Sequence, residues 1–457
     1  RGSRLTAISS SVMITGIVLI FILGYVCIAL EHKIKIDKAA FALLMCGIIW
    51  TVLSIFSGDA DIEGELVSYL GDTCETLIFL IGAMTIVDLI DMHGGFSIIT
   101  DHITTREKRR LMWLLAFITF FMSAVLDNMT TTIIMVMVLR RLISDRHERW
   151  IFTGVIVIAA NSGGAWSPIG DVTTIMLWMR GNVTAGALSG YLLLPCLVSL
   201  IIPTAFASRM VKGHVTHVAD AVAADALPEG VGPRFSRSVL IGGILGLLFV
   251  PVFKSLTGLP PYMGMMISLS VLWVCTEIVY DRKRGIEESI KNRVAKVVKH
   301  IDMPTILFFL GILMAVSGLQ YAGVLSDAAH FLDTHVHEAF SIATAVGILS
   351  SVVDNVPLVA ACMGMYPVAD PAAIAAAADP SYMAAFAADG TFWFMLAYCA
   401  GVGGSLLIIG SAAGVVAMGL EKIDFAWYFR RITLLALLGY MAGVVVILVE
   451  HILVGIG

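Results

Sequence analysis

The sequence predicts an all-α polytopic membrane protein made of two inverted repeats, and three observations support this prediction. The 457 residues are 58% apolar and only 14% charged, with a mean hydropathy of +0.92, whereas soluble domains average about 25% charged residues. Ten apolar runs are long enough to cross a bilayer, which takes roughly 20 residues. Two further apolar segments each contain an Asp-Asn pair, and these pairs lie 227 residues apart.

The ten predicted spans follow one another along nearly the whole chain. They cover residues 11–30, 39–56, 75–99, 150–178, 188–208, 238–256, 262–280, 304–325, 391–419 and 433–454. Residues 31–38 contain three lysines, whereas 57–74 are acidic and contain no Lys or Arg. Because basic residues accumulate on the cytoplasmic side, we expect 31–38 in the cytoplasm and 57–74, with both chain ends, outside it. The opening Arg1-Gly2-Ser3 has no Met and is left out of this prediction.

The remaining apolar segments, 111–139 and 338–366, are predicted to be re-entrant helical hairpins. Basic residues flank 111–139 on both sides, so a single crossing would place all the basic residues of one flank outside the cytoplasm. A hairpin that enters from the cytoplasm and turns at Asp127-Asn128 avoids this. The flanks of 338–366 contain no Lys or Arg, so this hairpin is expected to enter from outside. With this topology all but four of the 29 basic residues lie in cytoplasmic loops.

Matching motifs relate the two halves of the chain. Ser123, Asp127 and Asn128 match Ser350, Asp354 and Asn355, and a Gly-Gly pair at 163–164 matches another at 403–404. Each half contains five spans and one hairpin. Because five is odd, the second copy is expected to be inverted, as in many secondary transporters. The predicted domains are a first repeat at 1–208, a cytoplasmic linker at 209–237 and a second repeat at 238–457.

One span in each half is predicted to be a broken helix. Span 150–178 contains N-S-G-G-A-W-S-P-I-G-D-V-T-T from Asn161 to Thr174, and span 391–419 contains G-V-G-G-S-L-L-I-I-G-S-A-A-G from Gly401 to Gly414. Glycine loosens the helical backbone and proline removes a hydrogen-bond donor. Broken backbone at membrane depth is tolerated where it faces protein or a water-filled cavity, and there it can hold an ion. In each half, a hairpin tip is therefore expected to face a broken helix.

The polar residues of these segments form two predicted cation and proton sites, one per half. The first comprises Ser123, Asp127, Asn128, Thr130, Asn161, Asp171 and Thr173, and the second comprises Ser350, Asp354, Asn355, Ser405 and Ser411. An aspartate inside a membrane is costly and therefore a functional candidate. Carboxylate, amide and hydroxyl oxygens suit Na⁺ or Li⁺, and a proton can compete with the cation for a buried carboxylate. The expected Na⁺ ligands are Asp127, Asn128, Asp171, Asp354 and Asn355.

Three features of the chain resemble the motifs of NhaD-type sodium/proton antiporters, within the ion transporter superfamily. They are the run L-D-N-M-T-T-T from Leu126 to Thr132, the run from Asn161 to Thr174 and the paired Asp-Asn hairpins. The resemblance implies exchange of Na⁺ or Li⁺ for H⁺ in pH homeostasis, a bacterial inner-membrane location, and a homodimer with a scaffold and a mobile transport domain. It supports functional roles for Asp127, Asn128, Asn161, Asp171, Thr173, Ser350 and Asn355. The expected partners are the lipid bilayer and monovalent cations. No cofactor, nucleic acid or enzymatic activity is expected.

Other interpretations of these residues stay open at this point. Asp127 and Asp354 could simply cap helices, Asp171 could merely close the broken helix, and His93 is either a pH sensor or an ordinary interface residue. An anion carrier for citrate, dicarboxylates or arsenite is disfavoured because both tips carry aspartate and no motif contains Lys or Arg. An intramembrane hydrolase is disfavoured because the chain has no H-E-x-x-H motif among its 11 histidines.

Overall fold

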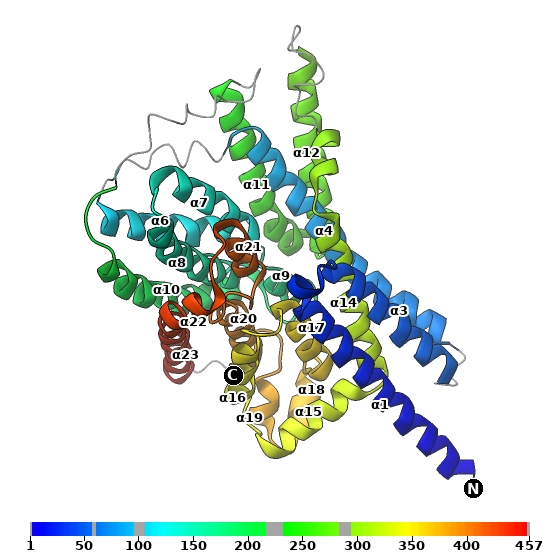
Figure 1. Ribbon diagram of the computed structural model, residues 1–457. Coiled ribbons are helices and arrows are strands. Elements are labelled where there is room, and N and C mark those ends of the chain that lie inside the picture. Colours follow the sequence, from blue (N-terminus) through cyan, green and yellow to red (C-terminus); the bar gives the residue numbers. More distant parts are fainter. Residues whose placement is uncertain are drawn as a thin grey trace. The chain divides into compact units, whose positions relative to one another are not determined.

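The structure is a computed structural model that describes residues 2–56, 61–95, 105, 107–215, 232–282 and 294–454. These residues form helices and two isolated β-bridges, without a strand (Figure 1), which confirms the all-α fold class. Seven helices of the described chain are long and apolar enough to cross a membrane. They are α3 (Lys38–Phe56), α4 (Ile62–Met92), α10 (Ala185–Met210), α11 (Pro233–Thr257), α12 (Pro261–Arg282), α14 (Met303–Tyr321) and α23 (Thr433–Val454).

The other three predicted spans are also helical. Span 11–30 lies in α1 (Gly2–Ala29) except for its last residue. Span 150–178 is divided into α8 (Arg146–Ala165) and α9 (Val172–Met179), with Pro168 between them, and span 391–419 is divided into α20 (Thr391–Gly403) and α21 (Ala412–Glu421). The two predicted helix breaks are thus confirmed.

Both predicted hairpin segments contain two helices separated by a short turn. Segment 111–139 forms α6 (Lys108–Ser123) and α7 (Asn128–Leu142), and segment 338–366 forms α16 (Ala339–Leu349) and α17 (Asn355–Met365). In both, the Asp of the Asp-Asn pair directly precedes the second helix. The side of the membrane from which each hairpin enters stays a prediction.

Several stretches that were expected to be loops are helical. The prediction of a loop at 57–74 is wrong for most of these residues, because α4 begins at Ile62. Glu63 and Glu65 lie in the first turn of α4, where negative charge stabilises a helix. Short helices occupy other expected loops: α2 (Glu31–Ile34), α13 (Val294–Val297), the 3₁₀ helix η1 (Val298–His300), α15 (Val324–His335), α18 (Pro371–Ala376), α19 (Pro380–Ala384) and α22 (Phe425–Arg431). Most of the predicted linker, residues 216–231, and the expected span end at 96–99 lie outside the described residues.

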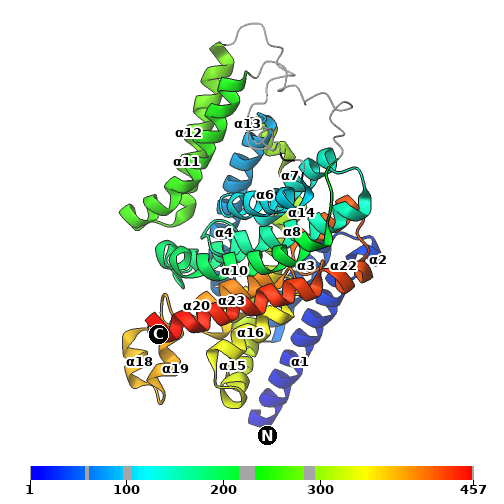
Figure 2. The ribbon, with the colours of Figure 1, turned by 90° about the vertical axis from the view of Figure 1, so that its left-hand side faces the viewer.

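The chain divides into two compact units. The first contains Arg1–Ile81, Asp302–Glu338 and Pro357–Pro367; within it α3 packs against both α1 and α14 (Figure 1), and Trp50 Nε1 donates to Met314 O at 2.8 Å. The second contains Gly82–Ile301, Ala339–Val356 and Val368–Gly457. In it α6, α7 and α8 pack together, and α10 runs next to α23 (Figure 2). The division into sequence repeats stays a prediction.

Two matching glycines bring a hairpin helix against a broken helix in each half. A Cβ added at Gly163 would clash with the carbonyl oxygen of Phe120, and one added at Gly403 would clash with that of Gly347. Only glycine allows two backbones to come this close. As a result, α6 contacts α8 and α16 contacts α20.

A buried ion pair joins three helix ends in the second unit. Glu421, at the end of α21, is only 2% exposed. Its carboxylate accepts from Arg140 Nε of α7 at 2.6 Å and from Arg149 Nε of α8 at 2.9 Å. A carboxylate removed from water needs such partners, because an unpaired buried charge is strongly destabilising.

We predict that Glu421→Gln lowers the free energy of unfolding by about 2 kcal/mol, less than the full cost of breaking a buried pair because the arginines reach solvent. Thermal unfolding of the detergent-solubilised protein measures this. The control is Glu107→Gln, since Glu107 pairs with Arg110 at 2.8 Å on the surface and its loss should change stability by less than about 0.5 kcal/mol. Equal effects of the two substitutions would contradict the prediction.

Candidate functional site

The same hydrogen bond attaches the hairpin to the broken helix in both halves. Ser123 Oγ, at the end of α6, donates to Ala160 O of α8 at 2.6 Å. Ser350 Oγ, just after α16, donates to Ala400 O of α20 at 2.9 Å. Both serines are fully buried. Equivalent residues of the two halves thus make equivalent contacts, and these contacts place each hairpin turn beside a helix break.

The Asp171 carboxylate is the centre of a buried hydrogen-bond network. Asp171 is 2% exposed and precedes α9, where its Oδ1 accepts from the backbone N of Thr173 at 2.9 Å and from Thr173 Oγ1 at 2.8 Å. Its Oδ2 accepts from Asn128 Nδ2 at 2.6 Å. Asn355 Nδ2 lies 3.4 Å from both carboxylate oxygens. Donors from both hairpins therefore converge on one carboxylate.

Asn161 extends this network to the second broken helix. Its Oδ1 accepts from Asn128 Nδ2 at 3.0 Å. Its Nδ2 lies 2.9 Å from both Ser405 Oγ and Ser411 Oγ. We refer to these seven residues as the Asp171 network: Asn128, Asn161, Asp171, Thr173, Asn355, Ser405 and Ser411.

The structure joins the residues of the two predicted sites in one hydrogen-bond network. The residues assigned to the second site, Asn355, Ser405 and Ser411, bond directly to residues assigned to the first, Asp171 and Asn161. The repeat in the sequence shows that each half carries a similar set of polar side chains. It contains no information on the distance between the two sets, which depends on how α8 and α20 pack.

The two Asp-Asn aspartates cap the helices that follow them. Asp127 accepts from Thr130 N at 2.7 Å and from Thr130 Oγ1 at 2.6 Å. Asp354 accepts from Val356 N at 3.3 Å. The capping role considered for these residues is therefore present. The Thr130 hydroxyl, which was predicted to belong to the first site, donates to the capping residue Asp127 and not to Asp171.

Four helix amino ends meet at the network, and each is occupied by an acceptor side chain of the chain itself. Asp127, Asp171 and Asp354 accept from the first turns of α7, α9 and α17, and Ser411 accepts from Gly414 N in α21 at 3.2 Å. Free amide groups at helix amino ends are ready-made anion sites. Here the chain places carboxylates and a hydroxyl on these amides, and three of the four acceptors can carry negative charge.

His93 lies in a different environment. It follows α4 and is fully buried; its Nδ1 is 2.7 Å from Leu89 O and its Nε2 is 2.7 Å from the Tyr280 hydroxyl of α12. The ring of Phe235 packs edge-on against it at 5.2 Å. These contacts join α4 to α11 and α12, and a pH-sensing role for His93 stays a prediction.

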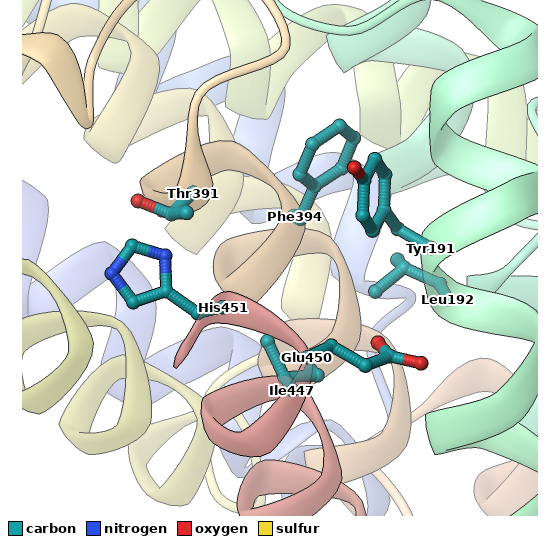
Figure 3. Close-up of a pocket in the computed structure, with 7 residues that line it drawn as sticks. All are labelled: Tyr191, Leu192, Thr391, Phe394, Ile447, Glu450 and His451. Carbon is teal, nitrogen blue, oxygen red and sulfur yellow. The ribbon is translucent and has the colours of Figure 1, made fainter. Parts of the chain in front are cut away.

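A small pocket between α10, α20 and α23 contains two titratable groups that the sequence analysis did not single out. Figure 3 shows Glu450 and His451 pointing away from each other, with Tyr191, Thr391 and Phe394 on the facing helices. None of the predicted site residues lines this pocket. The side chains do not converge on one point, so the arrangement gives no defined ligand set.

Comparison with known proteins identifies the family. The family model described as "Citrate transporter" matches residues 25–388. "Sodium/proton antiporter 1" and "Sodium/proton antiporter 2" of Arabidopsis thaliana are 43% and 41% identical to the chain, each over 95% of it, covering 72% and 99% of the relatives. "Na(+)/H(+) antiporter NhaD" of Vibrio cholerae is 29% identical over 95% of the chain and 91% of the relative. The chain belongs to the citrate transporter family and, within it, groups with the NhaD-type sodium/proton antiporters.

Proposed function

We propose that this membrane transporter exchanges Na⁺ or Li⁺ for H⁺, and that Asp171 is the carboxylate for which cation and proton compete. The observation that carries this proposal is the set of contacts around Asp171: a buried carboxylate held by two asparagine amides and a threonine hydroxyl. Relatives named as sodium/proton antiporters support it. Either ligand neutralises the carboxylate, so the site can be reoriented in the membrane without an unpaired charge.

Oxygen chemistry supports a small monovalent cation as the substrate. The network can offer carboxylate oxygens from Asp171, amide oxygens from the asparagines, and hydroxyl oxygens from Ser405, Ser411 and Thr173, which are hard ligands. Among the described residues, no group of three His, Cys, Asp or Glu side chains could hold a metal ion. The proposal requires the lipid bilayer and the transported ions, and no cofactor.

The second candidate, transport of an anion such as citrate, is suggested by the description of the family model. The helix amino ends argue against it. An anion would compete with Asp127, Asp171 and Asp354 for the same backbone amides and would be repelled by their charges. A hydrolytic aspartyl pair is also disfavoured, because Asp127 bonds to Thr130 whereas Asp171 bonds to asparagines and Thr173, and the family consists of transporters.

The proposal also covers the membrane in which the protein lies, the side on which its chain ends lie and its oligomeric state. We propose the inner membrane of a bacterium, with both chain ends extracytoplasmic, and a homodimer, as the resemblance to NhaD-type antiporters implies. The relatives of bacterial origin support a bacterial membrane. Light scattering of the solubilised protein tests the dimer, and the molar mass of a single chain would exclude it.

We predict that Asp171→Asn abolishes Na⁺-driven proton movement, because the substitution keeps the shape of the side chain and removes the titratable oxygen. Proteoliposomes with an imposed pH gradient and a pH-sensitive dye measure the exchange on addition of NaCl, LiCl or KCl. The control is Asp370→Asn, since Asp370 caps α18 at Ala373 N in an exposed position and should keep full activity. Full activity of folded Asp171→Asn would overturn the assignment.

The two hairpin aspartates are predicted to differ in importance. Asp127 uses one carboxylate oxygen on Thr130 N and the other on Thr130 Oγ1, and the amide of Asn has only one oxygen and does not titrate, so Asp127→Asn should also abolish exchange. Asp354→Asn should leave residual exchange with altered cation affinity, because the amide oxygen can still accept the backbone bond at Val356. Dye measurements over a range of NaCl concentrations compare the two variants, and equal activity of both would contradict the difference.

Competition for one carboxylate predicts a specific pH dependence. Lowering the pH should weaken the apparent affinity for Na⁺, approaching tenfold per pH unit for one displaced proton, with little change in maximal rate. Exchange measured at several pH values, in wild type and in His93→Ala, tests this. A fall in maximal rate at constant affinity, lost in His93→Ala, would favour His93 as a separate sensor.

A further inference from the structure

A lysine inside a predicted span contacts the far end of the half-helix that begins at Asp171. Lys254 lies in the last turn of α11. Its Nζ donates to the backbone oxygen of Trp178, in the last turn of α9, at 2.5 Å and lies 5.0 Å from the centroid of the Trp178 ring. Trp178 itself is buried. The ammonium group therefore touches both the backbone and the ring at the carboxyl end of α9.

This contact matches what the end of a helix requires. The carboxyl end of a helix carries partial negative charge, and its last carbonyl groups accept from groups beyond the helix; Trp178 O also accepts from Gly181 N at 3.2 Å. Lys254 adds a further donor and a positive charge, and the indole face adds a cation–π attraction. A lysine at a span end that only reached toward the lipid headgroups would extend its amine into water. Here the amine bonds to a carbonyl of another helix.

The length of α9 links this contact to the site. The helix has eight residues, about 12 Å at 1.5 Å per residue, and Thr173–Trp178 are all buried. Such a short, packed helix moves as one body. A displacement of its carboxyl end would therefore displace Asp171 at its amino end, together with the acceptor oxygens that Asn128 and Asn355 contact.

The second half-helix is held in a comparable way. At the end of α21, Arg140 donates to Leu420 O and Arg146 donates to Lys422 O at 3.0 Å. Both half-helices that begin at the Asp171 network thus end at a basic side chain. The difference is the source of the base: Arg140 and Arg146 come from α7 and α8, which also form the network, whereas Lys254 comes from α11, a separate span.

We propose that Lys254 is a positioning residue: by bonding the carboxyl end of α9 to α11, it fixes Asp171 within its network and thereby sets the affinity for the transported cation. The inference rests on the proposed cation exchange and adds a residue outside the predicted motifs. It also makes α11 a support for the site, although α11 supplies none of the side chains of the Asp171 network.

The test compares Lys254→Met with Lys254→Arg. Binding is measured by the rise in unfolding temperature with NaCl, which depends on affinity and needs no transport, and exchange is measured in proteoliposomes. Lys254→Met removes the charge and the hydrogen-bond donor, so the apparent Na⁺ affinity should fall about tenfold in both assays. A tenfold change lies within the free-energy range of a charge at the end of a partly buried helix. Lys254→Arg keeps charge and donor and should restore most of the affinity.

The matched control is Arg209→Met. Arg209 lies in the last turn of α10, and its guanidinium lies 5.7 Å from the ring of Phe206, but α10 does not begin at the network. This variant should bind Na⁺ as the wild type does. A lysine that only stabilised the fold would lower the unfolding temperature without NaCl and leave the Na⁺ dependence unchanged.

The proposal is overturned if folded Lys254→Met binds Na⁺ with wild-type affinity, or if Lys254→Arg is as weak as Lys254→Met. If Lys254→Met cannot be isolated folded, Lys254→Leu, which also lacks the charge and the donor, is judged by the same criterion. Wild-type protein that is stabilised by NaCl but exchanges no protons would refute the proposed exchange while the binding assay still tests Lys254. Wild-type protein without any NaCl effect would refute both.

Discussion

The arrangement of the second unit depends on the cost of keeping the Asp171 carboxylate away from water. Removing such a charge from water costs several kcal/mol, and each hydrogen bond to a charged group returns about 1.5–3 kcal/mol. The bonds come from three parts of the chain: Asn128 at the start of α7, Asn355 at the start of α17 and Thr173 in α9 itself. Both hairpin turns and the break between α8 and α9 bring these donors together, and the break frees the backbone N of Thr173, which would be paired in an unbroken helix. The second broken helix contacts Asn161 instead.

The two halves provide the same frame and different side chains. Matching serines and matching close-contact glycines attach each hairpin to its broken helix. At the crossing of α8 and α20, however, the first half has Asn161 and the second has Gly401, where an added Cβ would lie 2.9 Å from the Cβ of Ala165. The second half thus leaves space for Ala165 and supplies the hydroxyls of Ser405 and Ser411. The first half supplies the amide of Asn161 and the carboxylate of Asp171. One asymmetric site results from two similar halves.

The sequence predicted the long apolar helices, both hairpin turns and both breaks, because these depend on local properties: hydropathy, Gly and Pro positions, and Asp-Asn as a turn and cap. It also predicted the members of the Asp171 network. It could not predict that Asn355 and Asp171 would bond, because they are 184 residues apart and their contact follows from packing. It also missed the early start of α4, where Glu63 and Glu65 suggested a loop although acidic residues favour a first helical turn. The contact of Lys254 could not be predicted either, since no sequence pattern indicates that its amine meets Trp178.

The helix amino ends explain how one family frame can serve ligands of opposite charge. Where four helices begin around one site, their exposed amides favour an anion, which is the chemistry that a citrate transporter requires. In this chain Asp127, Asp171 and Asp354 accept from amides at three of these ends, so the positive ends of the helices help to stabilise the carboxylates. Negatively charged carboxylate oxygens thus occupy these helix ends, and under the proposed exchange a cation or a proton is the complementary ligand. On this view the preference for cations comes from the residue at each cap rather than from the topology of the fold.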